Sequence, residues 1–119
     1  MNREKTKLEA RIKRELNVLY KSAFGKGPET TETMIYENFV FLKFSSAFSP
    51  IEESLLKSDP GRDIVGQIRD ELILHQTALY TPTLESIVQE KVSKINYMLD
   101  EKNKCVYIFI LFANPINLV

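Results

Sequence analysis

A lysine between two glycines, in the stretch Gly25-Lys26-Gly27-Pro28, is the first group in this sequence that could do chemistry. Glycines let backbone amides turn inward as an anion nest, and a neighbouring lysine could hold a phosphate or a carboxylate. The alternative is purely structural, a helix C-terminus followed by a tight turn. Phosphate loops of nucleotide hydrolases have a longer glycine pattern that ends in Lys-Ser or Lys-Thr before a helix, so no such activity is predicted.

The stretch Asp59-Pro60-Gly61-Arg62 offers a second anion-binding candidate, because it predicts a helix N-terminus with an arginine at its mouth. Asp59 is expected to be the N-cap of that helix, and structural capping is the alternative to ligand binding. If Lys26 and Arg62 converge in the fold, they would form a pocket for a small anion. The candidate anion-binding residues are Gly25, Lys26, Gly27 and Arg62.

Other reactive side chains give no catalytic or metal-binding pattern. His75, the only histidine, is expected on the apolar stripe of a helix near Glu71, as a hydrogen-bonded core residue or as part of a weak pH-sensitive pair. Cys105, the only cysteine, excludes an internal disulfide and a cysteine-cluster metal site. No Gly-x-Ser-x-Gly motif is present. We therefore predict a protein that is not an enzyme and has no metal or cofactor.

A β-hairpin follows the glycine turn. Residues 31–36 and 39–44 are mostly β-branched, aromatic or aliphatic, and Glu37-Asn38 forms the reversal. A two-residue loop places Tyr36 opposite Phe39 and continues to Glu32 opposite Lys43. Successive side chains of a strand point to opposite faces of the sheet. One face of the hairpin is therefore predicted to carry Ile35, Val40, Leu42 and Phe44, and the other Met34, Tyr36, Phe39 and Phe41.

Both faces of this hairpin are apolar, and the chain's own helices can cover one of them. The other face needs a further layer or another subunit, and coverage by the N-terminal helix is the alternative. The candidate interface residues are therefore Met34, Tyr36, Phe39 and Phe41.

Three helices are predicted around the hairpin. The first runs from about Arg3 to Ala23, and the second begins with the capping box Ser49-Pro50-Ile51-Glu52 and ends near Lys57. The third begins at Asp59, and Pro82 is expected to kink it or to start a new segment that ends near Glu90. Its predicted buried stripe contains Ile64, Val65, Ile68, Leu72, His75 and Leu79, and Arg62, Asp63, Arg69 and Asp70 are expected away from the centre of that stripe.

Two further strands, Val92–Leu99 and Cys105–Phe112, complete the chain. The last strand is apolar on both faces, so it is expected to be central or covered on both sides, and the residues after it are expected to be loosely held. The predicted fold is one α+β domain over residues 1–119, in the order α-β-β-α-α-β-β. Its helices pack on a mixed or antiparallel sheet of about four strands.

Charge and hydropathy restrict the function further. The chain has 16 basic and 16 acidic residues, and this balance disfavours nucleic-acid binding, including an RNA-contacting role for the glycine turn. The charged N-terminus does not resemble a secretory signal. The longest apolar run, Cys105 to Ala113, is much shorter than the ~20 residues of a membrane-spanning helix. A cytoplasmic protein without direct membrane insertion is expected.

Several of these features together resemble the MpsC domain family, over nearly the whole chain. They are the Gly-Lys-Gly-Pro turn after a long charged helix, the hairpin, Gly61-Arg62 with Val65 and Arg69 at helical spacing, and the apolar last strand. That family is named for a sodium-translocating, membrane-potential-generating system of bacteria, and related systems are linked to inorganic-carbon uptake. The resemblance implies a cellular context and no catalytic residue.

The sequence therefore predicts a non-enzymatic cytoplasmic interaction module. It is expected to form a homodimer and to act with a membrane transport protein of an ion or inorganic-carbon transport system that supports membrane potential. The alternative function is a small-anion-binding regulatory protein that uses the Gly-Lys-Gly-Pro turn and Arg62.

Overall fold

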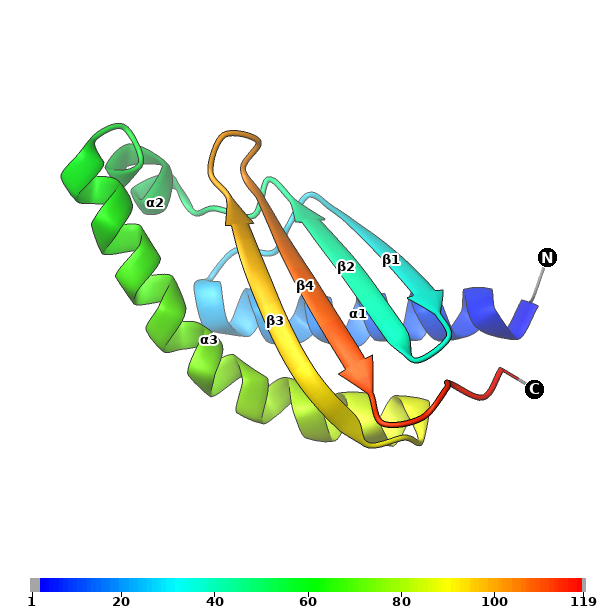
Figure 1. Ribbon diagram of the computed structural model, residues 1–119. Helices are drawn as coiled ribbons and strands as arrows, with labels where there is room; N and C mark the ends of the chain where they lie inside the picture. The colour runs from blue at the N-terminus through cyan, green and yellow to red at the C-terminus, as the bar shows by residue number, and fades with distance from the viewer. Residues whose placement is uncertain (1–2, 119) are drawn as a thin grey trace.

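The chain folds into two layers, an antiparallel sheet and the helices that cover one of its faces (Figure 1). The computed structural model describes residues 3–118. The elements are α1 (Arg3–Phe24), β1 (Thr30–Tyr36), β2 (Phe39–Ser45), α2 (Pro50–Leu55), α3 (Asp59–Val88), β3 (Val92–Asp100) and β4 (Cys105–Phe112). This confirms the predicted α+β class and element order.

The four strands lie in the order β1-β2-β4-β3, and every neighbouring pair is antiparallel. The hairpin has the predicted register, from Tyr36 opposite Phe39 to Glu32 opposite Lys43. Its turn is possible because Glu37 adopts a positive φ of 53°. Strand β4 is central, as predicted, because β2 and β3 pair with its two sides.

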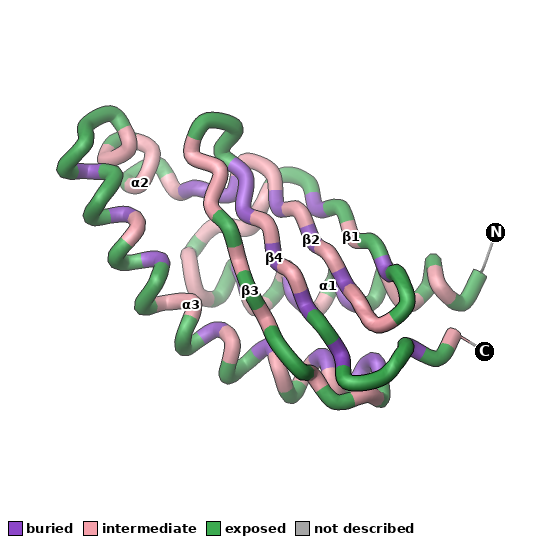
Figure 2. The backbone as a smooth tube through the Cα atoms, in the orientation of Figure 1, coloured by how far each residue is buried: buried purple, intermediate pink, exposed green. Residues whose placement is uncertain are grey.

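One face of the sheet forms the core. Burial alternates along β2 and, from Val106 onward, along β4, and Figure 2 shows purple segments recurring along both strands. Helix α1 crosses behind the sheet in Figure 1 and contributes Ile12, Leu16 and Tyr20 to the interior. The buried residues of the sheet are Thr31, Ile35, Val40, Leu42, Phe44, Cys105, Val106, Ile108, Ile110 and Phe112.

The buried side of α3 differs from the predicted stripe. Val65, Arg69, Gln76 and Tyr80 are buried, whereas His75 is exposed. Ile64, Ile68 and Leu79 are also exposed. The expected core position of His75 was therefore wrong, and Arg69, which was expected away from the centre of the buried stripe, is itself buried. The spacing of positions 65, 69, 76 and 80 places these residues on one side of α3. This buried side is rotated about the helix axis from the predicted apolar stripe toward Arg69 and Gln76.

Helix α3 continues through Pro82 without interruption, so a new segment does not begin there. The helix bends along its length in Figure 1. Two threonines bond back to the preceding turn near the proline: Thr77 Oγ1 donates to Ile73 O at 2.8 Å, and Thr81 Oγ1 donates to Thr77 O at 2.8 Å. Such bonds and an internal proline both favour bending.

Serine residues cap the N-termini of α2 and α3. The predicted capping box at Ser49 is present, since its Oγ accepts from Glu52 N at 3.3 Å and Glu52 Oε1 accepts from Ser49 N at 2.9 Å. The N-cap of α3 is Ser58, whose Oγ accepts from Gly61 N at 3.1 Å. The assignment of Asp59 as the cap was wrong by one residue, and Asp59 lies in the first helical turn.

The segment after β4 is held against the hairpin turn. Phe112 N donates to Asn38 O at 2.8 Å, and Ile116 N donates to Glu37 O at 3.0 Å. Ile116 is buried in the core. The prediction of a loosely held tail was therefore wrong as far as Leu118, and Val119 lies outside the described residues.

Candidate functional site

The second face of the sheet has no helix over it among residues 3–118 (Figure 1). The register places apolar side chains from all four strands on this surface. We call it the open face, and its members are Met34, Tyr36, Phe39, Phe41, Met98, Tyr107, Phe109 and Leu111.

The exposure of the open face is large. Tyr36 is 64% exposed, Met98 52%, Met34 49% and Leu111 39%. Side chains of this size have roughly 200 Å² of surface, so these four alone leave about 400 Å² of apolar surface uncovered. The four aromatic residues between them add more. Contiguous apolar patches of this size on a soluble chain commonly mark binding surfaces.

The centre of the open face is a group of contacting aromatic rings. The ring centroids of Phe41 and Phe109 are 5.3 Å apart, those of Phe41 and Tyr107 5.9 Å, and those of Phe39 and Phe109 6.2 Å. These distances lie in the range of favourable ring contacts, so the rings support one another in fixed positions. A partner would meet a surface whose aromatic side chains are already ordered, which lowers the entropic cost of binding.

Polar residues form two corners of the open face. Glu32 and Lys43 are paired at 4.0 Å at the β1 side of one end. Lys94 lies opposite Leu111 at the β3 side of the other end, and Asn96 lies opposite Phe109. An apolar centre with charged corners is the usual arrangement of a protein interface.

The free edge of β1 is partly occupied from within the chain. Ile35 N donates to Glu9 Oε2 of α1 at 2.9 Å, and Thr31 Oγ1 donates to Asn17 Oδ1 at 2.8 Å. The Ile35 bond uses a backbone N–H that an added strand would require, and the Thr31 bond joins two side chains between β1 and α1. The flat surface of the sheet is therefore better suited to a partner than this edge.

The predicted interface residues all lie on the open face, and α1 packs on the opposite side of the sheet. Met34 and Tyr36 are exposed, whereas Phe39 and Phe41 are half-buried by neighbouring rings. The sequence interpretation did not include the contribution of β3 and β4. Alternation in Tyr107, Phe109 and Leu111 was the available signal.

The candidate anion-binding residues have structural partners. Gly25, with φ at 77°, ends α1, and its N–H donates to Lys21 O at 2.8 Å. Arg62 Nη1 donates to Leu56 O at 2.9 Å, and Nη2 bonds Asp59. The C-terminus of α1 and the N-terminus of α3 lie apart in Figure 1. Joint binding of an anion by Lys26 and Arg62 stays a prediction.

A buried polar cluster, which the sequence interpretation missed, joins the three helices. Arg69 is 1% exposed, and its Nε and Nη2 donate to the two carboxylate oxygens of Glu52 at 2.6 and 2.7 Å. Nη1 donates to Tyr20 OH at 2.7 Å, and Nη2 also donates to Ala47 O at 3.0 Å. Tyr20 OH donates to the same carbonyl at 2.6 Å. We call these four residues the Arg69 cluster.

Aromatic rings enclose the guanidinium of the Arg69 cluster. Its Cζ lies 4.0 Å from the ring centroid of Phe24 and 4.9 Å from that of Phe48. A planar cation stacked on rings and bonded to a carboxylate through two nitrogens is strongly fixed. Because its hydrogen-bonding groups point into the protein, the cluster is suited to holding α1, α2 and α3 together.

Protonation states in the Arg69 cluster follow from burial and from its hydrogen bonds. Burial alone would raise the pKa of Glu52, but hydrogen bonds from Arg69 and Ser49 hold this pKa below its usual value. Burial raises the pKa of Tyr20, and the charge of Arg69 opposes that shift. At neutral pH the cluster therefore contains a carboxylate, a guanidinium and a neutral phenol.

The lowered pKa of Glu52 predicts loss of stability in acid. In the unfolded chain Glu52 takes up a proton near pH 4.3, whereas in the folded protein it does so only at lower pH. Its stabilising contribution is therefore complete above that value and decreases as the pH falls through the folded pKa. Urea unfolding measured from pH 7 downward should show a shallower acid slope for Glu52→Gln than for the wild type. Equal acid slopes for the variant and the wild type would contradict a lowered pKa of Glu52 in the folded protein.

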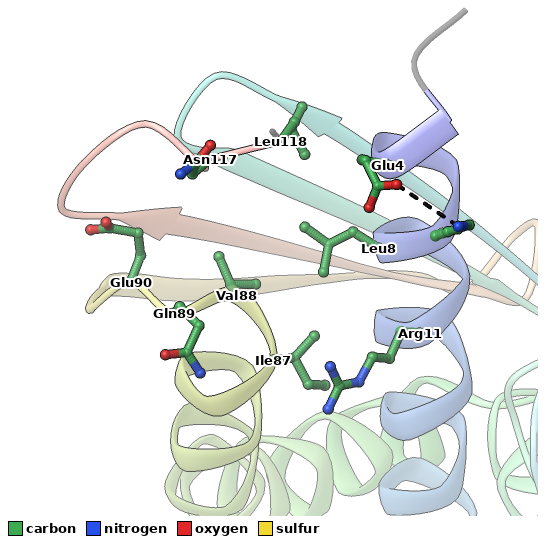
Figure 3. Close-up of a pocket in the computed structure, with 10 residues that line it drawn as sticks. Glu4, Leu8, Arg11, Ile87, Val88, Gln89, Glu90, Asn117 and Leu118 are labelled. Carbon is green, nitrogen blue, oxygen red and sulfur yellow. Dashed lines mark ion pairs between the residues drawn. The ribbon is translucent and has the colours of Figure 1, made fainter.

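A hollow of about 440 Å³ lies between the start of α1, the end of α3 and the C-terminal segment (Figure 3). Leu8, Ile87 and Val88 supply aliphatic surface, and Arg11 reaches from α1 toward α3. Glu4 and Lys7 form an ion pair at 3.8 Å at its side. No metal-binding cluster occurs among residues 3–118. The hollow combines opposite charges with apolar walls and lacks an evident catalytic arrangement.

The open face is an exposed apolar surface of the kind that commonly binds a partner. Across residues 3–118, no helix has the length and apolar character needed to cross a bilayer. Comparison with curated proteins found no match, and neither did comparison with solved structures. A family model described as "Na+-translocating membrane potential-generating system (MpsC)" matches residues 4–114, and the chain therefore belongs to the MpsC family.

Proposed function

We propose that this chain is a non-enzymatic, cytoplasmic interaction module of a bacterial membrane-potential-generating system. Family membership supplies the link to such a system. The observation that carries the interaction role is the open face, where about 400 Å² of apolar surface lies on four side chains alone. An apolar surface of this size is costly to leave in water, so a protein partner is its most economical explanation.

The proposed assembly is a homodimer that contacts a membrane transport protein of an ion or inorganic-carbon transport system. Burial of the open face against protein would remove Tyr36, Met98 and Met34 from water together. A direct anchor in the bilayer is not part of the proposal, since the described helices are too polar or too short to span it.

The alternative function, a small-anion-binding regulator, has weaker support. Arg62 is already bonded to Leu56 O and Asp59, and these bonds would compete with an incoming anion. Gly25 ends α1 with a φ of 77°, so helix termination accounts for this glycine. The interaction role is therefore preferred.

Complementation in cells tests the interaction role. Deleting the gene should lower the membrane potential measured with a potential-sensitive dye, and wild-type protein should restore it. Tyr36→Lys, which places a charge on the open face, should fail to restore it. The matched control is Val18→Lys, because Val18 on α1 is 62% exposed and Tyr36 is 64% exposed.

The control variant should complement fully, since it introduces the same charge on another surface. Equal levels of both variants, measured by immunoblot, would exclude loss of protein as the cause. A normal membrane potential in the deletion strain would contradict the proposed function. Full complementation by Tyr36→Lys would contradict the role of the open face.

A further inference from the structure

We infer that the open face is covered by a second copy of this chain, packed face to face with the strands of the two sheets crossing near a right angle. In this arrangement Glu32 of one protomer lies opposite the partner subunit's Lys94. The inference rests on the proposed function, because it names the protein that occupies the open face and the orientation in which it binds.

The strand register fixes where each side chain of the open face lies. One row across the sheet reads Tyr36, Phe39, Leu111, Lys94, and a row four residues further along the strands reads Glu32, Lys43, Tyr107, Met98. The row between them reads Met34, Phe41, Phe109, Asn96. Within these three rows Glu32 and Lys94 are at diagonally opposite corners, and Tyr36 and Met98 occupy the other two. A fourth row, which reads Thr30, Ser45, Cys105, Asp100, lies beyond Glu32 and Met98.

A two-fold axis between the sheets can run in four simple directions, and each pairs the corners differently. An axis along the strands places Glu32 on the partner's Met98, and an axis across the strands places it on the partner's Tyr36. In these two directions Lys94 lies against the partner's Tyr36 or the partner's Met98 and has no acidic side chain opposite it, and burying a charge without a partner is costly. An axis along the diagonal from Glu32 to Lys94 places Glu32 opposite the partner's Glu32 and Lys94 opposite the partner's Lys94, and both of these like-charge contacts are repulsive.

The remaining axis follows the diagonal from Tyr36 to Met98. It places each Glu32 opposite the partner's Lys94, so two opposite-charge pairs form at once. It also keeps Phe41 and Phe109 near the centre of the contact, where aromatic rings contribute most to binding. Strands related by this axis cross at nearly 90°, which is one of the two common ways in which sheets pack.

The available area agrees with a stable contact. The four most exposed side chains leave about 400 Å² of apolar surface on each copy, and Phe39, Phe41, Tyr107 and Phe109 are only half-buried. Two such faces, with their charged corners, approach the roughly 1,000 Å² that a specific interface requires.

Charge exchange at the two corners tests this arrangement on the purified full chain. The dissociation constant of the dimer is measured by sedimentation equilibrium. Glu32→Lys alone should weaken self-association at least about tenfold, and Lys94→Glu alone should do the same, because each creates like charges across the contact. The double variant Glu32→Lys/Lys94→Glu should return to within about threefold of the wild type, because the pair is restored with reversed signs.

Lys102→Glu serves as the charge control, since this exposed residue lies in the turn between β3 and β4 and away from the open face. It should associate like the wild type. Glu32 and Lys94 are both exposed, so the variants should keep the wild-type circular dichroism spectrum. Single variants that dimerise as tightly as the wild type would overturn the orientation.

A wild-type chain that stays monomeric at high micromolar concentration would overturn the second-copy inference. The proposed function fails by a different result, namely a normal membrane potential in the deletion strain, and the role of the open face fails if Tyr36→Lys complements fully in cells. A monomeric chain whose Tyr36→Lys variant cannot complement would assign the open face to another protein. That outcome would reject the inference and keep the interaction role.

Discussion

Replacing Arg69 with methionine is expected to lower the free energy of unfolding by about 3–5 kcal/mol, the usual cost of removing one partner of a buried ion pair. Methionine fills much of the same volume, so the loss arises from electrostatics more than from a cavity. The Glu52 carboxylate would lose both of its guanidinium bonds, and Tyr20 OH would lose a donor. The stack on Phe24 would also lose its cation.

Urea unfolding at pH 7, monitored by circular dichroism, measures this effect. Arg62→Met is the matched control, because Arg62 is also on α3 and bonds a carboxylate and a carbonyl, but at an exposed position. Its substitution should cost less than about 1 kcal/mol. Adding Glu52→Gln to Arg69→Met should cost less than the two single losses added together, because the unpaired charge is removed. A loss below about 1 kcal/mol for Arg69→Met would contradict the role of the cluster.

The hairpin was predictable from sequence to the level of individual pairs. Its register depends on a two-residue loop and on strong alternation, both of which are local properties. The capping box at Ser49 is also local, because the cap and Glu52 are three residues apart. These features need no knowledge of distant contacts.

The packing side of α3 was not predictable in the same way. The partners of Arg69 are Tyr20, 49 residues earlier, and Ala47, 22 residues earlier. Reading a sequence by hydropathy treats arginine as exposed. The stripe that contains Ile64 and Ile68 was therefore predicted to be the buried side of α3. Only the three-dimensional contact of α1, α2 and α3 provides the acceptors and rings that make burial of this guanidinium favourable.

The extent of the open face also depended on topology. The sequence placed Met34, Tyr36, Phe39 and Phe41 on one side of the hairpin, but it did not give the strand order. Pairing of β2 with β4 brings Phe109 beside Phe41 and adds two aromatic residues, Tyr107 and Phe109, to the three of the hairpin. The order β1-β2-β4-β3 is a consequence of non-local pairing, which alternation within a strand cannot specify.

The two glycines of the first turns of α3 are expected to respond in opposite directions to alanine. At Gly61, a Cβ atom would contact the backbone oxygen of Leu55 and lie 2.6 Å from its carbonyl carbon and 2.9 Å from Ser58 Oγ. Backbone atoms cannot move aside as a flexible side chain can, so the α2–α3 junction must open. We expect Gly61→Ala to lower the free energy of unfolding by about 3 kcal/mol, at the upper end of the usual cost of overpacking.

Gly66, one and a half turns further along the same helix, has open space where the Cβ would lie. Alanine there removes backbone freedom from the unfolded chain without a clash, so Gly66→Ala should stabilise the protein by about 0.5–1 kcal/mol. Thermal and urea unfolding of the two variants therefore compare the same chemical change at a closed and an open position. Similar effects of both substitutions would mean that close contact between Gly61 and Leu55 does not hold α2 against α3, and the Arg69 cluster would then be the main connection between these helices.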